Sequence, residues 1–139
     1  MKTTLTMALF SLGVLVFGRL KSFGSDSPAL QGTWSGQEVG ATITGSPSLT
    51  IEGAKLVFHG ADTNEWYTAT FKLREDKSPK QLEAVINDCP IPQYVGKTDQ
   101  AIYKIENGKL TLTGNEPGNP AVPASFDAQG AREFIFTRK

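Results

Sequence analysis

The stretch Trp66-Tyr67-Thr68-Ala69-Thr70-Phe71-Lys72-Leu73 alternates between two kinds of side chain. Its odd-numbered positions are all apolar or aromatic, whereas three of its four even-numbered positions are polar. A half-buried β-strand has this period of two, because successive side chains point to opposite faces of the sheet. The stretch therefore predicts a strand with one face on an apolar core.

Seven further segments, on both sides of this stretch, alternate in the same way or form short apolar runs. They are Thr33–Val39, Leu49–Ile51, Lys55–His59, Gln81–Asn87, Gln100–Ile105, Lys109–Thr113 and Glu133–Thr137. All eight prolines fall outside these segments, which supports the assignment because proline has no N–H to donate to a β-ladder. Asn107-Gly108, between two of the segments, is a residue pair preferred in two-residue hairpin turns.

Short links without helical crossovers join antiparallel strands. Eight such strands curl into a barrel or split into a sandwich, and the meander order favours the barrel. We therefore predict an all-β fold for residues 30–139, a single antiparallel eight-stranded β-barrel.

The inward positions of this barrel are mostly apolar or aromatic. Those that we interpret as candidate ligand-binding residues are Tyr67, Phe71, Leu73, Leu82, Ile86, Tyr103, Leu110, Leu112, Phe134 and Phe136. An eight-stranded barrel is just wide enough to be filled by side chains or to hold one small ligand, and the sequence leaves both open. The long proline-containing connections at 87–99 and 114–131 are candidates for loops that cover an open end.

Residues 1–24 are predicted to form a signal peptide. Lys2 precedes the apolar run Leu5–Phe17, which is too short for an ordinary membrane span of roughly 20 residues but matches the apolar region of a secretory signal. Arg19 and Lys21 follow the run and leave an uncleaved anchor as the alternative. We expect an exported protein, periplasmic or extracellular, that contacts a membrane only through this segment if it is uncleaved.

The composition argues against several classes of function. The chain has 14 basic and 14 acidic residues, and without residues 1–24 there are 11 basic against 14 acidic residues, a net charge of −3. A nucleic-acid binder would carry a basic footprint. With one histidine and one cysteine, the chain by itself cannot form a Cys/His zinc site, a CxxC redox pair or an internal disulfide. We predict no cofactor, no metal and no enzymatic activity.

Three sets of residues that could support catalysis or metal binding have simpler structural interpretations. His59 alternates with the inward Phe58, so we expect it on the outer surface rather than as a general base. Cys89 is interpreted as a small buried residue at a strand end, with a reactive thiol or an intermolecular bridge as alternatives. The run Asp62–Glu65 resembles the start of a calcium loop but lacks the glycine and the distal glutamate of that loop.

Four short motifs carry a family resemblance. Leu30-Gln31-Gly32-Thr33-Trp34 resembles the G-x-W opening of lipocalin-type barrels, and Pro79-Lys80, Gly96-Lys97-Thr98 and Pro117-Gly118 follow it in order. Over residues 30–139 the chain resembles an uncharacterised lipocalin-like domain family of exported planctomycete-type bacterial proteins. That family usually has Arg-Pro where this chain has Val122-Pro123. The resemblance implies a lipocalin-like barrel and export, and it implies no established activity.

The resemblance also implies how one end of the barrel is closed. In lipocalin-like barrels the tryptophan of the G-x-W motif plugs the closed end, and an arginine of the last strand lies over it. We expect Gly32, Trp34 and Arg138 to play these structural roles, with Arg132, on the same strand face, as the alternative partner of Trp34.

Two functions of different classes remain open at this stage. The first is a carrier or sensor that binds a small apolar ligand in or at the mouth of the barrel. The alternative is a non-catalytic interaction or scaffold module of the cell envelope, which would bind a protein partner through outward residues such as Trp66 and Val85.

Overall fold

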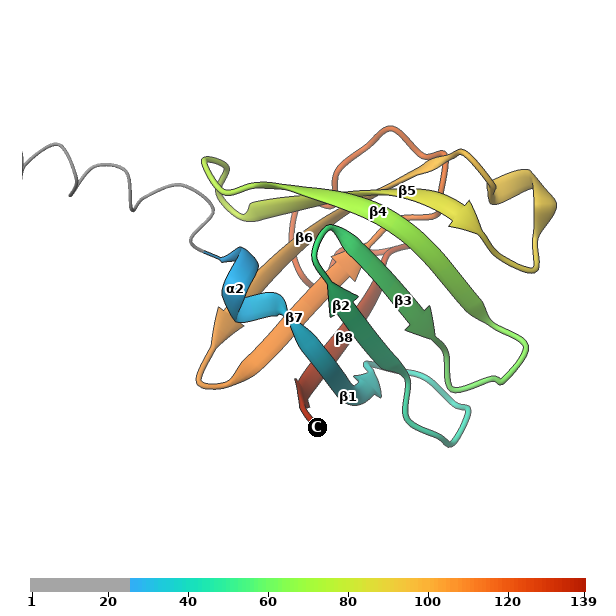
Figure 1. Cartoon of the computed structure of the whole chain (residues 1–139), viewed down its shortest axis with the longest axis horizontal. Helices are drawn as coiled ribbons and strands as arrows, with labels where there is room; N and C mark the ends of the chain where they lie inside the picture. The colour runs from blue at the N-terminus through green and yellow to red at the C-terminus, as the bar shows by residue number, and fades with distance from the viewer. Residues whose placement is uncertain (1–25) are drawn as a thin grey trace, which may run out of the picture.

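The computed structural model describes residues 26–139, and the predicted signal peptide at 1–24 lies outside the described residues. A short helix, α2 (Ser27–Leu30), leads into the sheet, and a 3-10 turn, η1 (Pro92–Tyr94), lies between β5 and β6 (Figure 1). The strands are β1 (Gly32–Glu38), β2 (Ser48–Glu52), β3 (Lys55–His59), β4 (Trp66–Arg74), β5 (Lys80–Asp88), β6 (Thr98–Glu106), β7 (Lys109–Gly114) and β8 (Arg132–Arg138). Within the described part of the chain, no helix is both long and apolar enough to cross a membrane.

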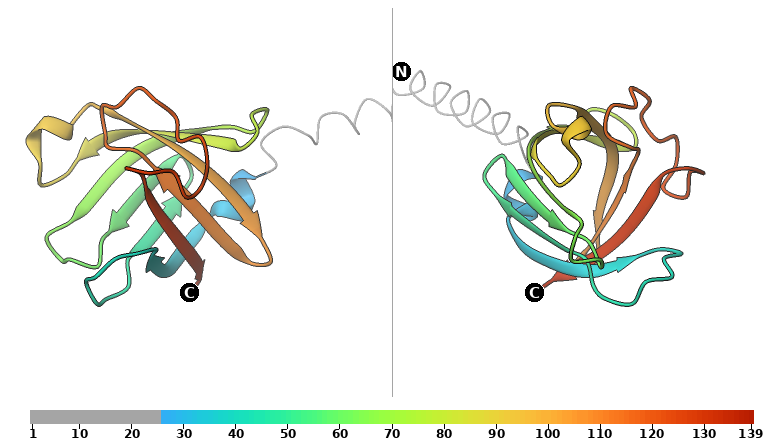
Figure 2. Two further views of the ribbon diagram at one scale, coloured as in Figure 1. Left: turned by 180° about the vertical axis from the view of Figure 1, so that it is seen from behind. Right: turned by 90° about the vertical axis from the view of Figure 1, so that its right-hand side faces the viewer.

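The eight strands form a closed antiparallel barrel. Each strand pairs with the next one along the chain, and β1 pairs with β8 (Figure 2). The predicted hairpin at Asn107-Gly108 joins β6 to β7, and both residues have the positive φ values, 54° and 75°, that such a turn needs. The predicted all-β fold, a single antiparallel eight-stranded barrel, is confirmed.

Most of the strands are longer than the side-chain pattern predicts. The strand expected at Gln100–Ile105 runs from Thr98 to Glu106, for example, because backbone pairing continues where the alternation of side chains has ended. The helix α2 and the turn η1 were not predicted, since four and three residues are too few to show a helical period.

The interior of the barrel is apolar, as expected. Leu82, Leu110 and Phe136 are all buried on the inward face. The sequence did not anticipate that part of the outer face is buried as well. Ile102 and its cross-strand neighbour Thr113 are fully buried, and the Thr113 hydroxyl donates a hydrogen bond to the Phe126 carbonyl at 2.8 Å. The connection between β7 and β8 therefore also packs over the outside of β6 and β7.

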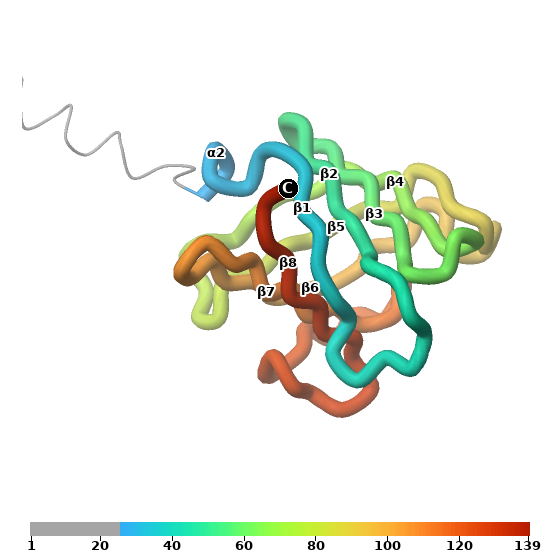
Figure 3. Tube along the Cα trace, turned by 90° about the horizontal axis from the view of Figure 1, so that it is seen from below, coloured from blue at the N-terminus to red at the C-terminus, as the bar shows by residue number. Residues whose placement is uncertain are grey.

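One end of the barrel is closed by Trp34 and α2. Trp34 is 1% exposed, and its Nε1 donates to the Leu30 carbonyl at 2.9 Å. The Arg138 guanidinium lies over the Trp34 ring at 4.5 Å and donates to the carbonyls of Gln31 and Ala29. Figure 3 shows the end of β8 beside α2 and the start of β1. Arg138 is thus the residue that stacks on Trp34, and the alternative pairing of Trp34 with Arg132 is wrong.

Asp26 links α2 to the strands beneath it. Its Oδ2 accepts hydrogen bonds from the Tyr103 hydroxyl at 2.8 Å and from Lys80 Nζ at 2.9 Å. Burial alone would raise the pKa of Asp26, but these hydrogen bonds outweigh burial and leave the pKa below its ordinary value. Tyr103 therefore braces the closed end.

The seam between β1 and β8 requires a glycine. Gly36 pairs with Phe136, and a Cβ at position 36 would lie 1.9 Å from the Ile135 carbonyl oxygen. That is far inside van der Waals contact with backbone, which cannot move aside as a flexible side chain can.

Replacing Arg138 with alanine should lower the free energy of unfolding by about 2–3 kcal/mol, because the cation–π contact and two charge-assisted hydrogen bonds are lost. Urea denaturation followed by tryptophan fluorescence measures this change. Arg138→Lys should lower the free energy of unfolding by less than Arg138→Ala does. Lys109→Ala, a change at an exposed residue, should leave it almost unchanged. Equal stability of Arg138→Ala and the unmodified chain would contradict this account of the closed end.

Gly36→Ala should prevent closure of the barrel or lower the free energy of unfolding by more than about 3 kcal/mol, because β1 can no longer approach β8. Gln37→Ala, at the exposed neighbouring position, is the matched control and should fold normally. Circular dichroism and thermal unfolding distinguish the two variants. A Gly36→Ala protein as stable as Gln37→Ala would show that the seam tolerates a side chain.

Candidate ligand-binding cavity

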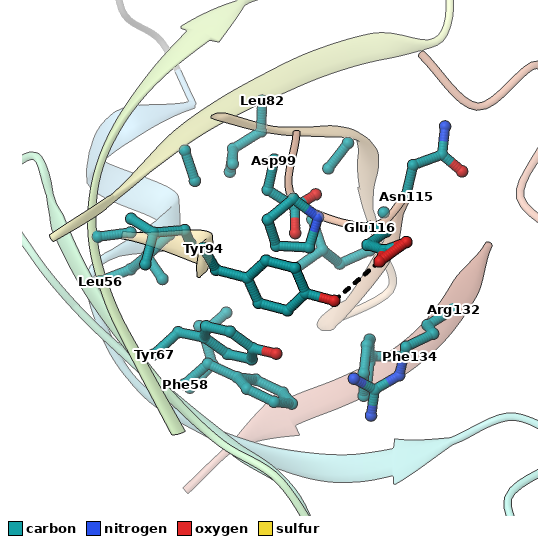
Figure 4. A pocket seen from close by; sticks show the side chains of 18 of the residues that line it. Leu56, Phe58, Tyr67, Leu82, Tyr94, Asp99, Asn115, Glu116, Arg132 and Phe134 are labelled. Carbon is teal, nitrogen blue, oxygen red and sulfur yellow. Dashed lines mark hydrogen bonds between the residues drawn. The ribbon is translucent and has the colours of Figure 1, made fainter. Parts of the chain in front are cut away.

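The end of the barrel opposite Trp34 holds a cavity of about 220 Å³ that is partly open to solvent. Its walls come from the inward faces of β2 to β8, and its mouth is bordered by the β5–β6 and β7–β8 connections (Figure 4). Ligand pockets typically measure about 300–1,000 Å³, so this one suits a ligand with few heavy atoms. The lining residues are Leu49, Leu56, Phe58, Tyr67, Ala69, Leu82, Ala84, Ile86, Tyr94, Asp99, Ala101, Leu112, Gly114, Asn115, Glu116, Pro117, Gly130, Arg132 and Phe134.

The cavity exists because small residues occupy inward positions on four successive strands. Ala69 on β4, Ala84 on β5, Ala101 on β6 and Gly114 on β7 all line it. Ala101 is the cross-strand neighbour of Gly114, so no bulky side chain fills this part of the wall. Larger residues at these positions would complete a packed core, as they do at the closed end.

Aromatic rings form another part of the wall. The Phe58 ring lies 6.1 Å from that of Tyr67 and 5.1 Å from that of Phe134, and the Tyr67 ring lies 6.5 Å from that of Tyr94. These centroid distances are typical of mutually stabilising aromatic pairs. Burial, helped by the charge of Glu65, raises the pKa of Tyr67 to about 12, so its hydroxyl is neutral at physiological pH.

Two contacts organise the mouth. The Tyr94 hydroxyl donates to Glu116 Oε2 at 2.8 Å and so joins the two long connections. Arg132 donates through Nε and Nη2 to both Glu38 carboxylate oxygens at 2.8 Å, and also to Glu65. Hydrogen bonds from Arg132 lower the pKa of Glu38. The two carboxylates therefore more than balance the positive charge of the Arg132 guanidinium.

Asp99 is an acidic residue in the wall of the cavity. Its carboxylate points into the cavity (Figure 4), and its Oδ1 is inaccessible to solvent and accepts no hydrogen bond from residues 26–139. A Cβ at position 114 would lie 3.0 Å from this oxygen, so Gly114 leaves the room that the carboxylate occupies. Burial raises the pKa of Asp99 to about 7, and the more distant charge of Arg132 opposes the rise only in part.

The structure divides the ten predicted ligand-binding residues into two groups. Five line the cavity: Tyr67, Leu82, Ile86, Leu112 and Phe134. The other five do not line it: Phe71, Leu73, Tyr103, Leu110 and Phe136. The period-two pattern assigns a face but not a depth along the barrel axis, and these residues lie inward where the barrel is filled rather than hollow.

Several lining residues were not predicted. Asp99 stands one residue before the expected strand, and Tyr94 and Glu116 lie in connections, where no periodicity applies. Arg132 was considered only for the closed end. The one signal that would have revealed the cavity is the recurrence of alanine or glycine at inward positions on neighbouring strands.

The other candidates for chemistry lie outside the cavity. His59 is exposed, as predicted, and Cys89 is a buried free thiol that donates to the Ile91 carbonyl at 3.1 Å, which confirms its interpretation as a buried strand-end residue. Asp62 Oδ1 accepts from the Asn64 backbone N–H at 2.9 Å, and Glu65 binds Arg132. No group of three or more metal-ligating side chains is found among residues 26–139.

This arrangement has room for a small molecule with an apolar body and leaves one carboxylate facing that space. Comparisons with protein-family models, with curated proteins and with solved structures find no match to the chain. Function is therefore inferred from the geometry of the cavity.

Asp99→Asn should change how stability depends on pH. The folded protein holds the Asp99 proton more tightly than the unfolded chain does, because the pKa rises from 3.8 to about 7 on folding. Stability contributed by this group is therefore fully present below pH 3.8 and is lost as pH rises to about 7. At pH 8 the Asn variant should be more stable by about 2–4 kcal/mol, and the two proteins should converge towards pH 4.

Urea denaturation at pH 4, 6 and 8 measures this difference. Asp76→Asn is the matched control, since it removes the same charge from an exposed turn between β4 and β5. If Asp99→Asn and Asp76→Asn showed the same pH profile, Asp99 would not be a buried, destabilising acid.

Proposed function

We propose that this protein is a non-catalytic binding protein that holds a small, largely apolar ligand inside the open end of its barrel. The observation that carries the proposal is the cavity of about 220 Å³, walled by aliphatic and aromatic side chains and bordered by a few polar groups. A hollow of this kind is the usual form of a small-molecule site. A fully packed interior, the alternative left open by the sequence, would have argued against it.

The two long connections fit this function. They lie at the mouth, where Tyr94 from the first bonds Glu116 from the second, and both residues line the cavity. A ligand entering from solvent has to pass these loops. This hydrogen bond joins two connections, so it can open while the strand pairing of the barrel stays intact.

The alternative function, an envelope scaffold that binds a protein partner, has weaker support. Val85 is 42% exposed, as expected for an outward residue, but its cross-strand neighbours are Thr70 and Thr98. Trp66 is only half-buried and pairs with His59. These outward apolar residues do not form a continuous apolar patch, so the cavity is the better-supported site.

We also propose that the chain is exported and related to the lipocalin-like family that it resembles. The support for export is the signal-like sequence of residues 1–24. The support for kinship is that the G-x-W motif at Gly32 and Trp34 stands at the closed end, under Arg138. Mass spectrometry of the mature N-terminus from the native host tests the export proposal.

Native mass spectrometry of the protein purified from its own host tests the binding proposal most directly. A co-purifying small molecule that is released on unfolding is the expected result. The mass of that molecule would also identify it. Protein that carries no such molecule, and that also fails to bind any small apolar compound added to it, would overturn the proposal.

Ala84→Leu should fill the cavity and weaken binding of toluene and 1-hexanol at least tenfold, because the new side chain occupies the space of the ligand. Its stability without ligand should be unchanged or slightly higher, since a cavity is filled rather than a packed core overfilled. Ligand at 100 times its Kd for the unmodified protein should stabilise that protein by about 2.7 kcal/mol, and the variant by no more than about 1.4 kcal/mol.

Thermal unfolding measures the stability of each protein without ligand and the increase in stability that the ligand causes. Ala54→Leu makes the same substitution in the exposed β2–β3 turn and is the matched control. Equal protection of Ala84→Leu and Ala54→Leu would show that these compounds bind elsewhere.

A further inference from the structure

We propose that the ligand of the cavity is a small primary amine with an apolar body, bound as its ammonium ion with Asp99 as its counter-charge. This inference rests on the proposed function and deepens it. It follows from the unpaired carboxylate, the charges of the lining and the aromatic wall.

The first observation is the carboxylate without a partner. Asp99 faces an otherwise largely apolar cavity, and its Oδ1 has no hydrogen-bond donor among the described residues. Rotation about the last torsion of an aspartate is soft, so either oxygen can turn towards the cavity at little cost. A ligand that fills the space without a donor leaves the ionised carboxylate without a partner, and this lowers its affinity. The tightest-binding ligand therefore brings its own donor.

The second observation concerns the sign of the charge. The charged side chains that line the cavity are Asp99, Glu116 and Arg132. Arg132 is already bound by Glu38 and Glu65, so its positive charge is not available to a ligand. The charge left over is negative, which repels carboxylates and phosphates and attracts a cation.

The third observation is the aromatic wall. Phe58, Tyr67 and Tyr94 line the same cavity as Asp99 and lie in one connected row of rings. The faces of aromatic rings carry partial negative charge and stabilise a nearby ammonium group. Both sources of attraction, the carboxylate and the rings, favour a cation over a neutral molecule of the same shape. A primary ammonium has three N–H donors, so it can bond Asp99 and also contact a ring.

The position of Asp99 supports a role in binding over a role in folding. Its neighbours in the cavity wall are Ala84 on β5 and Gly114 on β7. Both are too small to shield the carboxylate from the cavity, and neither has a side-chain donor. Asp26 at the closed end shows the contrast, because Lys80 and Tyr103 both donate to that carboxylate. A buried acid that lacks such partners reduces stability, and residues of this kind are expected at functional sites.

The test compares three ligands of one chain length, 1-hexylamine, 1-hexanol and hexanoate, by titration calorimetry at pH 8 with the purified full-length protein. We expect the amine to bind at least tenfold more tightly than the alcohol, and hexanoate to bind most weakly. Asp99→Asn should weaken amine binding at least tenfold and leave alcohol binding within about twofold, since the charge-assisted hydrogen bond is lost and the apolar contacts remain.

Asp76→Asn serves as the control for net charge and should bind all three ligands as the unmodified protein does. Thermal unfolding of Asp99→Asn without ligand verifies that the variant is folded. If the alcohol and the amine bind equally and Asp99→Asn changes neither, the amine proposal fails while the binding function stands. If none of the three ligands binds and toluene does not bind either, the binding function itself fails.

Discussion

β1 and β8, the first and last strands of the barrel, are paired along five positions, from Trp34 opposite Arg138 to Glu38 opposite Phe134. This pairing removes both edges of the sheet and turns one face of every strand into an interior. The pairing brings the backbone of β1 so close to that of β8 at Gly36 that any Cβ there would collide with the Ile135 carbonyl. The seam also brings Arg138 over Trp34 and Arg132 next to Glu38, so one strand pair organises both ends of the barrel.

The two ends differ because their side chains differ in volume. At the closed end Trp34, Phe136 and Tyr103 fill the interior, and α2 covers them through the Leu30 carbonyl and Asp26. At the open end alanine and glycine occupy equivalent inward positions and leave about 220 Å³ unfilled. A closed barrel cannot collapse to remove such a space, since its radius is set by strand number and tilt. The cavity is therefore a direct result of residue size at a few positions.

Asp99 shows how a binding site and stability can conflict. An acid with a pKa raised to about 7 by burial is costly when ionised, and a fold under no functional demand would gain stability by replacing it. The aromatic rings and the paired Arg132 around it do not remove this cost, because none of them donates a hydrogen bond to Oδ1. A cationic ligand would remove it, which connects the stability of the protein to the chemistry of its site.

Most of the fold was predictable because it follows from local rules. Alternation of side chains and short apolar runs located the eight strands, proline positions marked the connections, and Asn107-Gly108 marked a hairpin. The stacking of Arg138 on Trp34 was also foreseen, through the G-x-W resemblance and the face that Arg138 shares with Phe136. Boundaries shifted by one or two residues, because a β-ladder is held by backbone hydrogen bonds that do not depend on side-chain type.

The binding site was predictable only in part. The sequence by itself determined which side chains point inward, since a strand alternates its faces with a period of two. Only the tertiary structure decided which of them meet at the same height in the barrel, because height depends on how neighbouring strands are staggered. That stagger places Asp99 beside Ala84 and Gly114, brings Tyr94 to Glu116, and leaves Phe136 in a packed core rather than in a cavity.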